Sequence, residues 1–331
     1  AALQKHNESH RFFLGVGLHK PHLPFIAPRK YWDLYPNVSI ARHHAPPLHW
    51  GPAKQWAWDP NSGPRHCQDI AAMNLTEYAQ LPGDTQVEMR RMYYAAVSYV
   101  DALIGRLLSQ LHQLNLWDNT AVVVLGDHGW HLGEQGSFGK KTNFEKATRA
   151  PLIFRVPNMT TPSKQTWQLT EFVDIFPTVA ELAGVPVPPC PLNATATRLC
   201  TQGSSLVPLL TSHTANSLSK SAAFMQYPPC MHDSVFHDAC LNSTDPTSMG
   251  YAIRTDGWRY IEWVAFNKAT AQPDWSSLLA NELYRHTDQR NNGEHDNADE
   301  DEEKENLVAN PEYRNVVERL SVALRAGWHQ S

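Results

Sequence analysis

TAVVVLGDHGWHLGEQGSFGKKTNF, residues 120–144, joins an unbroken apolar run to a polar, glycine-rich loop. A short apolar run that ends in a turn is typical of a buried strand in a parallel sheet. Open α/β sheets bind their ligands at the carboxyl ends of the strands. Asp127 and His128 follow the run directly, and Lys140 lies later in the same loop. We therefore interpret this loop as a metal-binding or catalytic site rather than a structural turn.

Two further apolar runs have the same character as residues 120–127. They are FFLGVG at 12–17 and PLIFRVP at 151–157, and all three are predicted to be strands of one mostly parallel sheet. A helix is predicted over 93–114, where apolar residues recur at steps of three and four, and another over 170–184. The alternation of strands and helices predicts an α/β fold with helices flanking a central sheet.

The character of the sequence changes after residue 212. Two strand-like runs in YAIRTDGWRYIEWVAF, residues 251–266, flank an Asp-Gly pair and predict a hairpin. Residues 310–328 have the pattern of an amphipathic terminal helix. We therefore divide the chain into a larger domain at 1–212 and a smaller C-terminal α+β subdomain at 213–331.

Two segments show no helical or strand periodicity. Residues 28–85 are rich in proline, tryptophan and histidine and are predicted to form an extended surface excursion. Residues 291–306 form an acidic run without the spacing of a calcium loop, and they are predicted to be a solvated loop.

Glycosylation and disulfide signals indicate the secretory route. Six Asn-x-Ser/Thr acceptors occur, at Asn7, Asn37, Asn74, Asn158, Asn193 and Asn242. Four of the five cysteines bracket two short loops, which predicts the disulfides Cys190–Cys200 and Cys230–Cys240 and leaves Cys67 over. The chain begins with neither a methionine nor a signal peptide, so we expect its natural amino terminus to lie outside this sequence.

The charge of the chain depends strongly on pH. Its formal net charge is −5 with histidine neutral, and protonating all 17 histidines would raise it to +12 before any carboxylate is protonated. An acidic compartment would therefore favour anionic substrates, although the same histidines could be ordinary surface residues. No basic stripe or recognition motif indicates nucleic-acid binding, and no apolar run is long enough for a transmembrane helix.

A second polar cluster follows the first apolar run. FFLGVGLHKPHLPF, residues 12–25, places His19 directly after its predicted strand, and Pro21 and Pro24 stiffen the chain beyond it. Such a histidine could be a general acid, a metal ligand or a core residue, and this stretch alone does not separate the three.

Several stretches together resemble the sulfatase family of the alkaline-phosphatase-like superfamily, most closely its iduronate-2-sulfatase branch. They are GLHKPHLPF at 17–25, GDHGWHLGEQG at 126–136 and ATRAPLIFRVP at 147–157, with Lys140 between the last two. The similarity continues through DIFPTVAELAGVPVPP, RLC, QYP, MGYAIRTDGWRY and ELY, so it spans nearly the whole chain. No single stretch is specific, whereas the combination is.

The resemblance implies one calcium ion held in part by Asp127 and His128. Calcium prefers oxygen ligands and imidazole suits softer metals, so the histidine is unusual for this ion. The resemblance further implies that His19 contacts the sulfate and donates a proton to the leaving oxygen, and that Lys140 holds a sulfate oxygen. Lys20 and Trp130 are expected to line the substrate pocket.

The nucleophile that the resemblance implies is absent from the sequence. Sulfatases convert the cysteine or serine of Cys/Ser-x-Pro-x-Arg into formylglycine, and none of the five cysteines here stands in that motif. We expect the chain to be the later part of a sulfuric ester hydrolase that acts on sulfated glycosaminoglycans. Its nucleophile would lie in a missing N-terminal segment, its partner would be the formylglycine-generating enzyme, and its location would be lysosomal or secreted. The alternatives are a non-catalytic relative that binds sulfated glycans and a metal-dependent phosphoesterase of the same superfamily.

Overall fold

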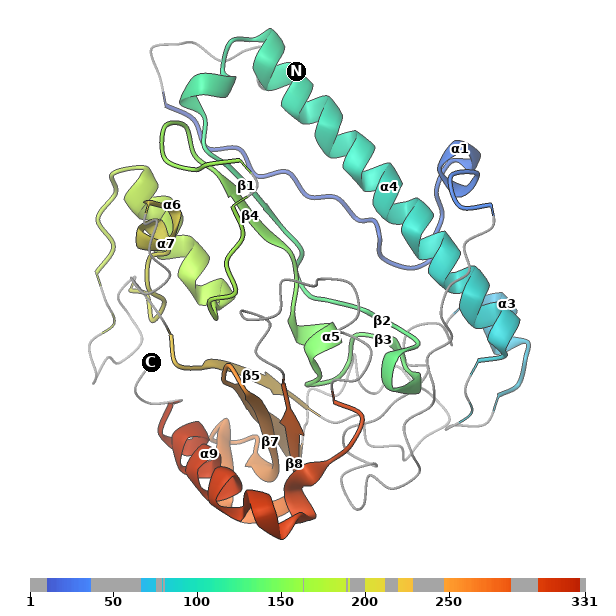
Figure 1. Cartoon of the computed structure of the whole chain (residues 1–331), viewed down its shortest axis with the longest axis vertical. Coiled ribbons are helices and arrows are strands. Elements are labelled where there is room, and N and C mark those ends of the chain that lie inside the picture. Colours follow the sequence, from blue (N-terminus) through green and yellow to red (C-terminus); the bar gives the residue numbers. More distant parts are fainter. Residues whose placement is uncertain are drawn as a thin grey trace.

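The computed structural model describes residues 11–36, 67–75, 79, 81–162, 164–188, 190, 200–211, 220–228, 247–286 and 303–327. In Figure 1 a long helix, α4 (Gly83–Gln113), runs along one side of the molecule. The strands β1 (Val122–Leu125) and β4 (Leu152–Arg155) lie nearer the centre of the molecule in this view. A four-stranded sheet with the C-terminal helix α9 (Arg314–Gly327) occupies the opposite end. None of the helices in these described ranges is both long and apolar enough to cross a membrane.

Helix α4 confirms the predicted helix over 93–114 and begins earlier, at Gly83 directly after Pro82. Its apolar positions bury Met89 and Leu111 against the rest of the molecule. The short helices α1 (Arg29–Trp32) and α3 (Gln68–Ala71) belong to the predicted surface excursion. Trp32 of α1 donates a hydrogen bond from Nε1 to Glu88 of α4 at 3.1 Å, so this part of the excursion is anchored on the helix. The short 3-10 turn η4 (Trp117–Asn119) leads from α4 to β1.

The runs 120–127 and 151–157 form strands as predicted, but their pairing is antiparallel. Val124 lies opposite Ile153 and Leu125 opposite Leu152. A parallel pair needs a crossover that returns the chain to the far end of the sheet. Residues 126–151 instead leave and re-enter at the same end, where the Gly126 N–H donates to the Pro151 carbonyl at 3.0 Å. The expected parallel pairing of these two runs is therefore wrong.

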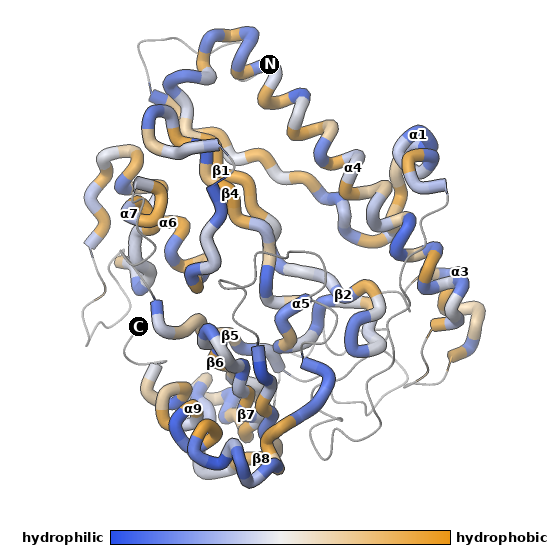
Figure 2. The backbone as a smooth tube through the Cα atoms, viewed as in Figure 1, coloured by the Kyte–Doolittle hydropathy of each residue, from blue (hydrophilic) through white to orange (hydrophobic). Residues whose placement is uncertain are grey.

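The apolar run 12–17 forms no strand, contrary to prediction. Residues 11–19 are extended without pairing to any strand in the described part of the chain, and their side chains are exposed, Phe13 to 85%. A β-strand forms only where a neighbouring strand offers N–H and C=O groups for hydrogen bonding. An apolar run in the sequence does not show whether such a neighbour is present. Figure 2 shows the apolar character of this segment where it passes between α4 and β1.

The second sheet is antiparallel in the order β5-β6-β7-β8. Its strands are β5 (Ala223–Tyr227), β6 (Ser248–Arg254), β7 (Trp258–Asn267) and β8 (Gln272–Arg285). The predicted hairpin is confirmed as β6 and β7, whose turn is closed by reciprocal hydrogen bonds between Thr255 and Trp258. The predicted terminal helix is confirmed as α9, preceded by the 3-10 turns η7 (Leu307–Ala309) and η8 (Pro311–Tyr313).

The two faces of this sheet have different partners. Leu320 and Leu324 of α9 pack with Tyr260 and Leu283 on one face. On the other face Phe144, from the loop between β1 and β4, packs with a second apolar group of the sheet: Ala252, Ile261, Trp263, Ala280 and Tyr284. Burial of both faces makes the sheet the best-formed core among the described residues, and it fixes one end of that loop.

A helix at the edge of the molecule confirms the one predicted over 170–184. It comprises the 3-10 turn η6 (Phe172–Asp174) and α6 (Ile175–Leu182), and Gly184, two residues after its last residue, has a φ of +70°, which favours glycine. Asp174 is fully buried and accepts hydrogen bonds from Lys220 at 2.7 Å and from the Ser204 N–H at 2.8 Å. The short helix α7 (Val207–Thr211) contacts α6.

The predicted disulfide Cys190–Cys200 is present, with an S–S distance of 2.09 Å. Cys230 and Cys240 lie outside the described residues. Cys67 stands at the N-cap position of α3 and is a free thiol, whose pKa is raised by partial burial and by the charge of Asp69. One of the two predicted disulfides is therefore confirmed.

Two of the six predicted glycosylation acceptors lie in the described part of the chain. Asn74 and Asn158 are exposed and have positive φ values of 48° and 59°, a conformation that asparagine tolerates in turns. Asn7, Asn37, Asn193 and Asn242 lie outside the described residues. Both described acceptors are therefore accessible to modification.

Candidate functional site

The loop from Gly126 to Arg149 folds back on itself through a small hairpin. Strands β2 (His131–Leu132) and β3 (Phe138–Gly139) pair antiparallel around the 3-10 turn η5 (Glu134–Gly136). The turn uses positive φ at Gly133 (111°) and Gly136 (66°), which glycine adopts without strain. The hairpin returns the chain toward its start, and α5 (Glu145–Thr148) then leads into β4.

This folding brings Lys140 onto the end of β1. The Lys140 Nζ lies 2.8 Å from Nε2 of His128, and the same Nε2 lies 3.3 Å from Oδ2 of Asp127. The Asp127 carboxylate is largely exposed, with its side chain 86% accessible, whereas His128 and Lys140 are half-buried. The three residues that the sequence placed in one polar loop are thus in direct contact.

The hydrogen bonds of His128 define its tautomer. Its Nδ1 lies 2.8 Å from the Gly129 carbonyl, which can only accept, so Nδ1 carries the proton. Nε2 then has a free lone pair in the neutral ring, and the Lys140 ammonium donates to it. The lone pair of His128 therefore accepts from the Lys140 ammonium, and a metal ion could bind Nε2 only where this ammonium has moved away.

This donor set fits part of a metal site. A metal-binding histidine commonly donates its second ring N–H to a backbone carbonyl, as His128 does to Gly129. Calcium is bound by about six to eight ligands, most of them oxygen atoms, so one carboxylate and one imidazole are too few for a complete site. Asp127 and His128 could hold one side of a metal ion, and the remaining ligands would have to come from outside this pair.

Trp130 links the loop to the N-terminal polar cluster. The Lys140 Nζ lies 5.9 Å from the Trp130 ring, within cation–π range, and Trp130 packs edge to face on Phe25 with ring centroids 5.8 Å apart. The indole N–H of Trp130 is buried and has no hydrogen-bond partner among the residues that the structure describes. Trp130 therefore connects Lys140 to Phe25 and the N-terminal segment.

His19 and Lys20 lie on the same N-terminal segment but do not bond to this group. The exposed His19 ring contacts His22, with ring centroids 4.9 Å apart. The Lys20 ammonium donates to the carbonyls of His22 at 3.0 Å and Pro24 at 2.6 Å. Direct contacts therefore connect four of the predicted site residues: Asp127, His128, Lys140 and Trp130. His19 and Lys20 lie in a turn of the N-terminal segment, where they contact residues of that same turn.

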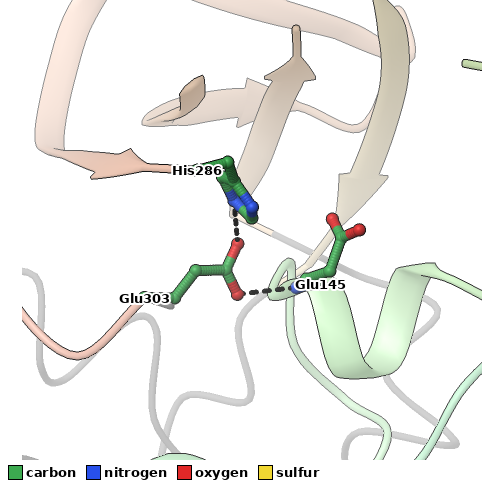
Figure 3. A group of neighbouring side chains, drawn as sticks. All are labelled: Glu145, His286 and Glu303. Atoms are coloured by element: carbon green, nitrogen blue, oxygen red, sulfur yellow. Dashed lines mark hydrogen bonds and ion pairs between the residues drawn. The ribbon is translucent and has the colours of Figure 1, made fainter. Parts of the chain in front are cut away.

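A buried ion-pair cluster joins the start of α5 to the four-stranded sheet, and it was not predicted from the sequence. Arg259 of β7 is buried between the carboxylates of Glu145 and Glu303 and forms ion pairs with both. His286 lies 3.0 Å from Glu303, whose other oxygen accepts from the Glu145 N–H at 2.7 Å, as Figure 3 shows. These residues are far apart in the sequence, so only the tertiary fold reveals the cluster.

Charge holds the acidic members of this cluster ionised. Burial alone would raise the pKa of Glu145, but the charges of Arg259 and Arg254 outweigh it and lower that pKa to about 2. Burial opposes ionisation of Glu303 as well, and Arg259 together with His286 lowers its pKa. The predicted solvated loop at 291–306 is therefore wrong at Glu303, which is 3% exposed because it neutralises a buried arginine.

Glu145, His286 and Glu303 also offer possible metal ligands within 4.8 Å of one another. Arg259 already occupies the space between the two carboxylates, and Arg254 binds Glu145 at 3.1 Å. A metal ion there would face two guanidinium charges at close range, so the arrangement fits a buried ion-pair network better than a metal site.

Comparison with known proteins agrees with this geometry. The sulfatase family model matches residues 1–185, and the model of the N-sulphoglucosamine sulphohydrolase C-terminal region matches residues 133–275. Iduronate 2-sulfatases of Mus musculus and Homo sapiens are each 35% identical over 82% of this chain, covering 55% and 56% of their own lengths. A choline-sulfatase of Rhizobium meliloti is 30% identical over 77% of the chain and 43% of its own length.

Solved structures confirm the α/β fold of the alkaline-phosphatase-like class. A phosphonate monoester hydrolase of Silicibacter pomeroyi matches with a TM-score of 0.65 at 21% identity, over 93% of this chain and 54% of its own. A protein solved in complex with its substrate D-glucosamine-2-N,6-O-disulfate matches with a TM-score of 0.54 at 25% identity, over 80% of this chain and 46% of its own. The chain spans about half the length of the curated relatives that it matches. From the family match over residues 1–185 and the iduronate 2-sulfatase identity, the chain belongs to the sulfatase family of sulfuric ester hydrolases.

Proposed function

We propose that this chain forms the sulfate-recognition part of an enzyme that hydrolyses the 2-O-sulfate of iduronate at the non-reducing end of heparan or dermatan sulfate. The observation that carries the proposal is the contact of Asp127, His128 and Lys140 at the end of β1. The 35% identity to iduronate 2-sulfatases supports the choice of sugar.

In this proposal each polar residue has one task. Lys140 provides a fixed positive charge for a sulfate oxygen, and Trp130 forms the pocket wall beside it. His19 donates a proton to the alcohol oxygen that leaves when the sulfur–oxygen bond breaks, and Lys20 lines the pocket next to it. Asp127 and His128 contribute ligands to one calcium ion, which would neutralise sulfate charge when bound.

We further propose that the nucleophile comes from a segment outside this sequence. The 331 residues contain no Cys-x-Pro-x-Arg motif, and the chain spans about half the length of its curated relatives. Formylglycine would supply the attacking oxygen in the whole protein, and the formylglycine-generating enzyme would produce it. The disulfide and the two exposed glycosylation acceptors support a secreted or lysosomal location.

Ligand binding tests sulfate recognition on this chain directly. We expect the purified chain, in the presence of calcium, to bind a disaccharide ending in 2-O-sulfated iduronate and not its desulfated form, as measured by titration calorimetry. Lys140→Ala should weaken binding about tenfold or more, because a charge-assisted hydrogen bond contributes roughly 1.5–3 kcal/mol. Lys164→Ala is the matched control, since Lys164 donates to the Leu209 carbonyl away from the site.

The outcomes separate the alternatives. Equal affinity for the sulfated and desulfated sugars would refute sulfate recognition, and tighter binding of the matching phosphate ester would favour a phosphoesterase. The transcript upstream of the Ala1 codon decides between catalysis and binding alone. An in-frame Cys-x-Pro-x-Arg codon run supports the enzyme, whereas an in-frame stop codon would leave a glycan-binding relative.

A further inference from the structure

His131 is a fully buried histidine that the proposed reaction does not use. It lies in β2, three residues after His128, and has no exposed surface. Its Nε2 lies 2.9 Å from the Thr142 hydroxyl, and its Nδ1 lies 3.3 Å from the Glu134 carbonyl. Its ring packs edge to face on Phe144, with centroids 6.0 Å apart.

These contacts define a neutral ring with both nitrogens paired. The Glu134 carbonyl can only accept, so Nδ1 carries the proton, and the Thr142 hydroxyl donates to the lone pair of Nε2. The Thr142 oxygen in turn accepts from the Phe144 N–H at 3.3 Å. Burial lowers the pKa of His131, opposed by Glu134 and Glu303 and assisted by Lys146, which favours this neutral form of the ring.

The contacts of His131 bracket Lys140 along the chain. Its backbone lies opposite Gly139 in the pairing of β2 with β3, one residue before Lys140. Its side chain binds Thr142, two residues after Lys140. The segment that carries Lys140 is thus held on both sides by one residue of the opposite strand, close in sequence to His128.

We propose that His131 and Thr142 form a positioning pair that holds Lys140 beside His128 and so sets the sulfate-binding charge in place. A lysine side chain has four rotatable bonds. A fixed backbone at Lys140 reduces the number of positions that its ammonium group can occupy. The role in sulfate binding rests on the proposed function, whereas the placement of Lys140 on His128 does not.

Thr142→Val tests the pair, because valine keeps the shape of threonine and removes the hydroxyl. Thr142→Ser restores the hydroxyl, and Thr148→Val is the matched control in the same loop, since the Thr148 hydroxyl donates to the Phe144 carbonyl at the start of α5 (3.0 Å) and not to His131. The first readout is the ¹⁵N spectrum of the His128 imidazole at fixed pH in the full chain without metal. We expect Thr142→Val to move the Nε2 signal toward its position in Lys140→Ala, and Thr142→Ser and Thr148→Val to keep the wild-type signal.

The second readout is affinity for the 2-O-sulfated disaccharide in the presence of calcium. We expect Thr142→Val to weaken binding about fivefold, as for one lost hydrogen bond, and to have no further effect in the Lys140→Ala background. An unchanged His128 signal in Thr142→Val, or additive losses in the double variant, would overturn the positioning role. Failure of the wild-type chain to bind the disaccharide would refute the proposed function, and the His128 spectrum would still decide whether the pair positions Lys140.

Discussion

Gly129 has a role that its position in the sequence only partly indicates. Its N–H donates to the Ala147 carbonyl at 2.8 Å, so the loop after β1 lies directly against α5. A Cβ at this position would overlap the carbonyl oxygens of Lys146 and Arg149. These are backbone atoms and cannot rotate away. Absence of a side chain at Gly129 is therefore what allows the loop after β1 to lie against α5.

Gly129→Ala should consequently destabilise the fold by about 1–3 kcal/mol, the usual cost of overpacking. Gly105→Ala is the matched control, because a Cβ at Gly105 on the exposed surface of α4 meets no atom within 4 Å. That substitution should stabilise the helix by roughly 0.5–1 kcal/mol. Urea denaturation of both variants measures the two free energies of unfolding. A shift of the same sign in both would contradict the close packing at Gly129.

At the scale of single residues, some members of the candidate site could be predicted from the sequence alone and others could not. Asp127, His128 and Lys140 share one loop, so local spacing predicted that they belong together, and the structure places them in contact. His131 stands in the same loop but shows no polar role in the sequence, because its partner Thr142 becomes a neighbour only through the pairing of β2 with β3.

At the scale of elements, the buried ion pairs of Arg259 join α5 to the four-stranded sheet. Arg259 belongs to β7, Glu145 begins α5, and Glu303 precedes η7. The Arg259 guanidinium also donates to the Asn143 carbonyl at 2.9 Å. The loop that carries Lys140 is thus tied to the sheet by charge as well as by Phe144.

Arg259→Met should destabilise the protein by about 3–5 kcal/mol, because it leaves the buried Glu303 carboxylate without its arginine and removes one of the arginines that pair with Glu145. Arg29→Met is the matched control, since Arg29 forms an exposed pair with Asp33 at 2.8 Å, and such pairs contribute only about 0.3–0.5 kcal/mol. Thermal and urea unfolding measure both variants. Equal losses would show that the buried network contributes no more than a surface ion pair.

Elements were predictable from the sequence where the signal is local. The periodicity of α4 and the Asp-Gly turn between β6 and β7 depend on neighbouring residues only, and both are confirmed. Strand pairing depends on which partner is available, so the apolar runs predicted neither the antiparallel pairing of β1 with β4 nor the unpaired state of residues 12–17. The acidic composition of residues 291–306 predicted that Glu303 is exposed, and this was wrong. An acidic run does not show which of its carboxylates forms an ion pair with a buried arginine.

At the scale of the whole molecule, the well-buried core lies toward the C-terminal end. The strands β6 and β7 are buried along most of their length, whereas no residue of β1 or β4 is fully buried. The boundary that we proposed at residue 212 separates these regions in sequence, yet Phe144 packs within the core of the C-terminal sheet. The candidate site therefore depends on the stability of a sheet that begins about eighty residues later, since long-range packing couples distant segments.

Stability of this sheet should depend on pH through Glu282. Burial raises the pKa of Glu282 to about 7, against the hydrogen bonds that it accepts from Trp263 and Tyr284, each 2.5 Å long. A carboxyl group with a raised pKa favours the folded state fully below its unfolded pKa of about 4.5, and this contribution is lost as the pH rises through about 7. Through Glu282, the folded sheet is therefore more stable in mild acid than at neutral pH.

Comparison of Glu282→Gln with the parent chain isolates this contribution, because the buried neutral His131 changes the stability of both proteins in the opposite direction below its ordinary pKa. Between about pH 4.5 and pH 7.5 the parent should lose about 3 kcal/mol relative to Glu282→Gln, since each unit of pKa shift corresponds to about 1.4 kcal/mol. Glu181→Gln, at an exposed position of α6, should follow the parent at every pH. Urea unfolding at half-unit pH steps measures the three profiles, and parallel curves for the parent and Glu282→Gln would show that Glu282 ionises in the folded protein as it does in the unfolded chain.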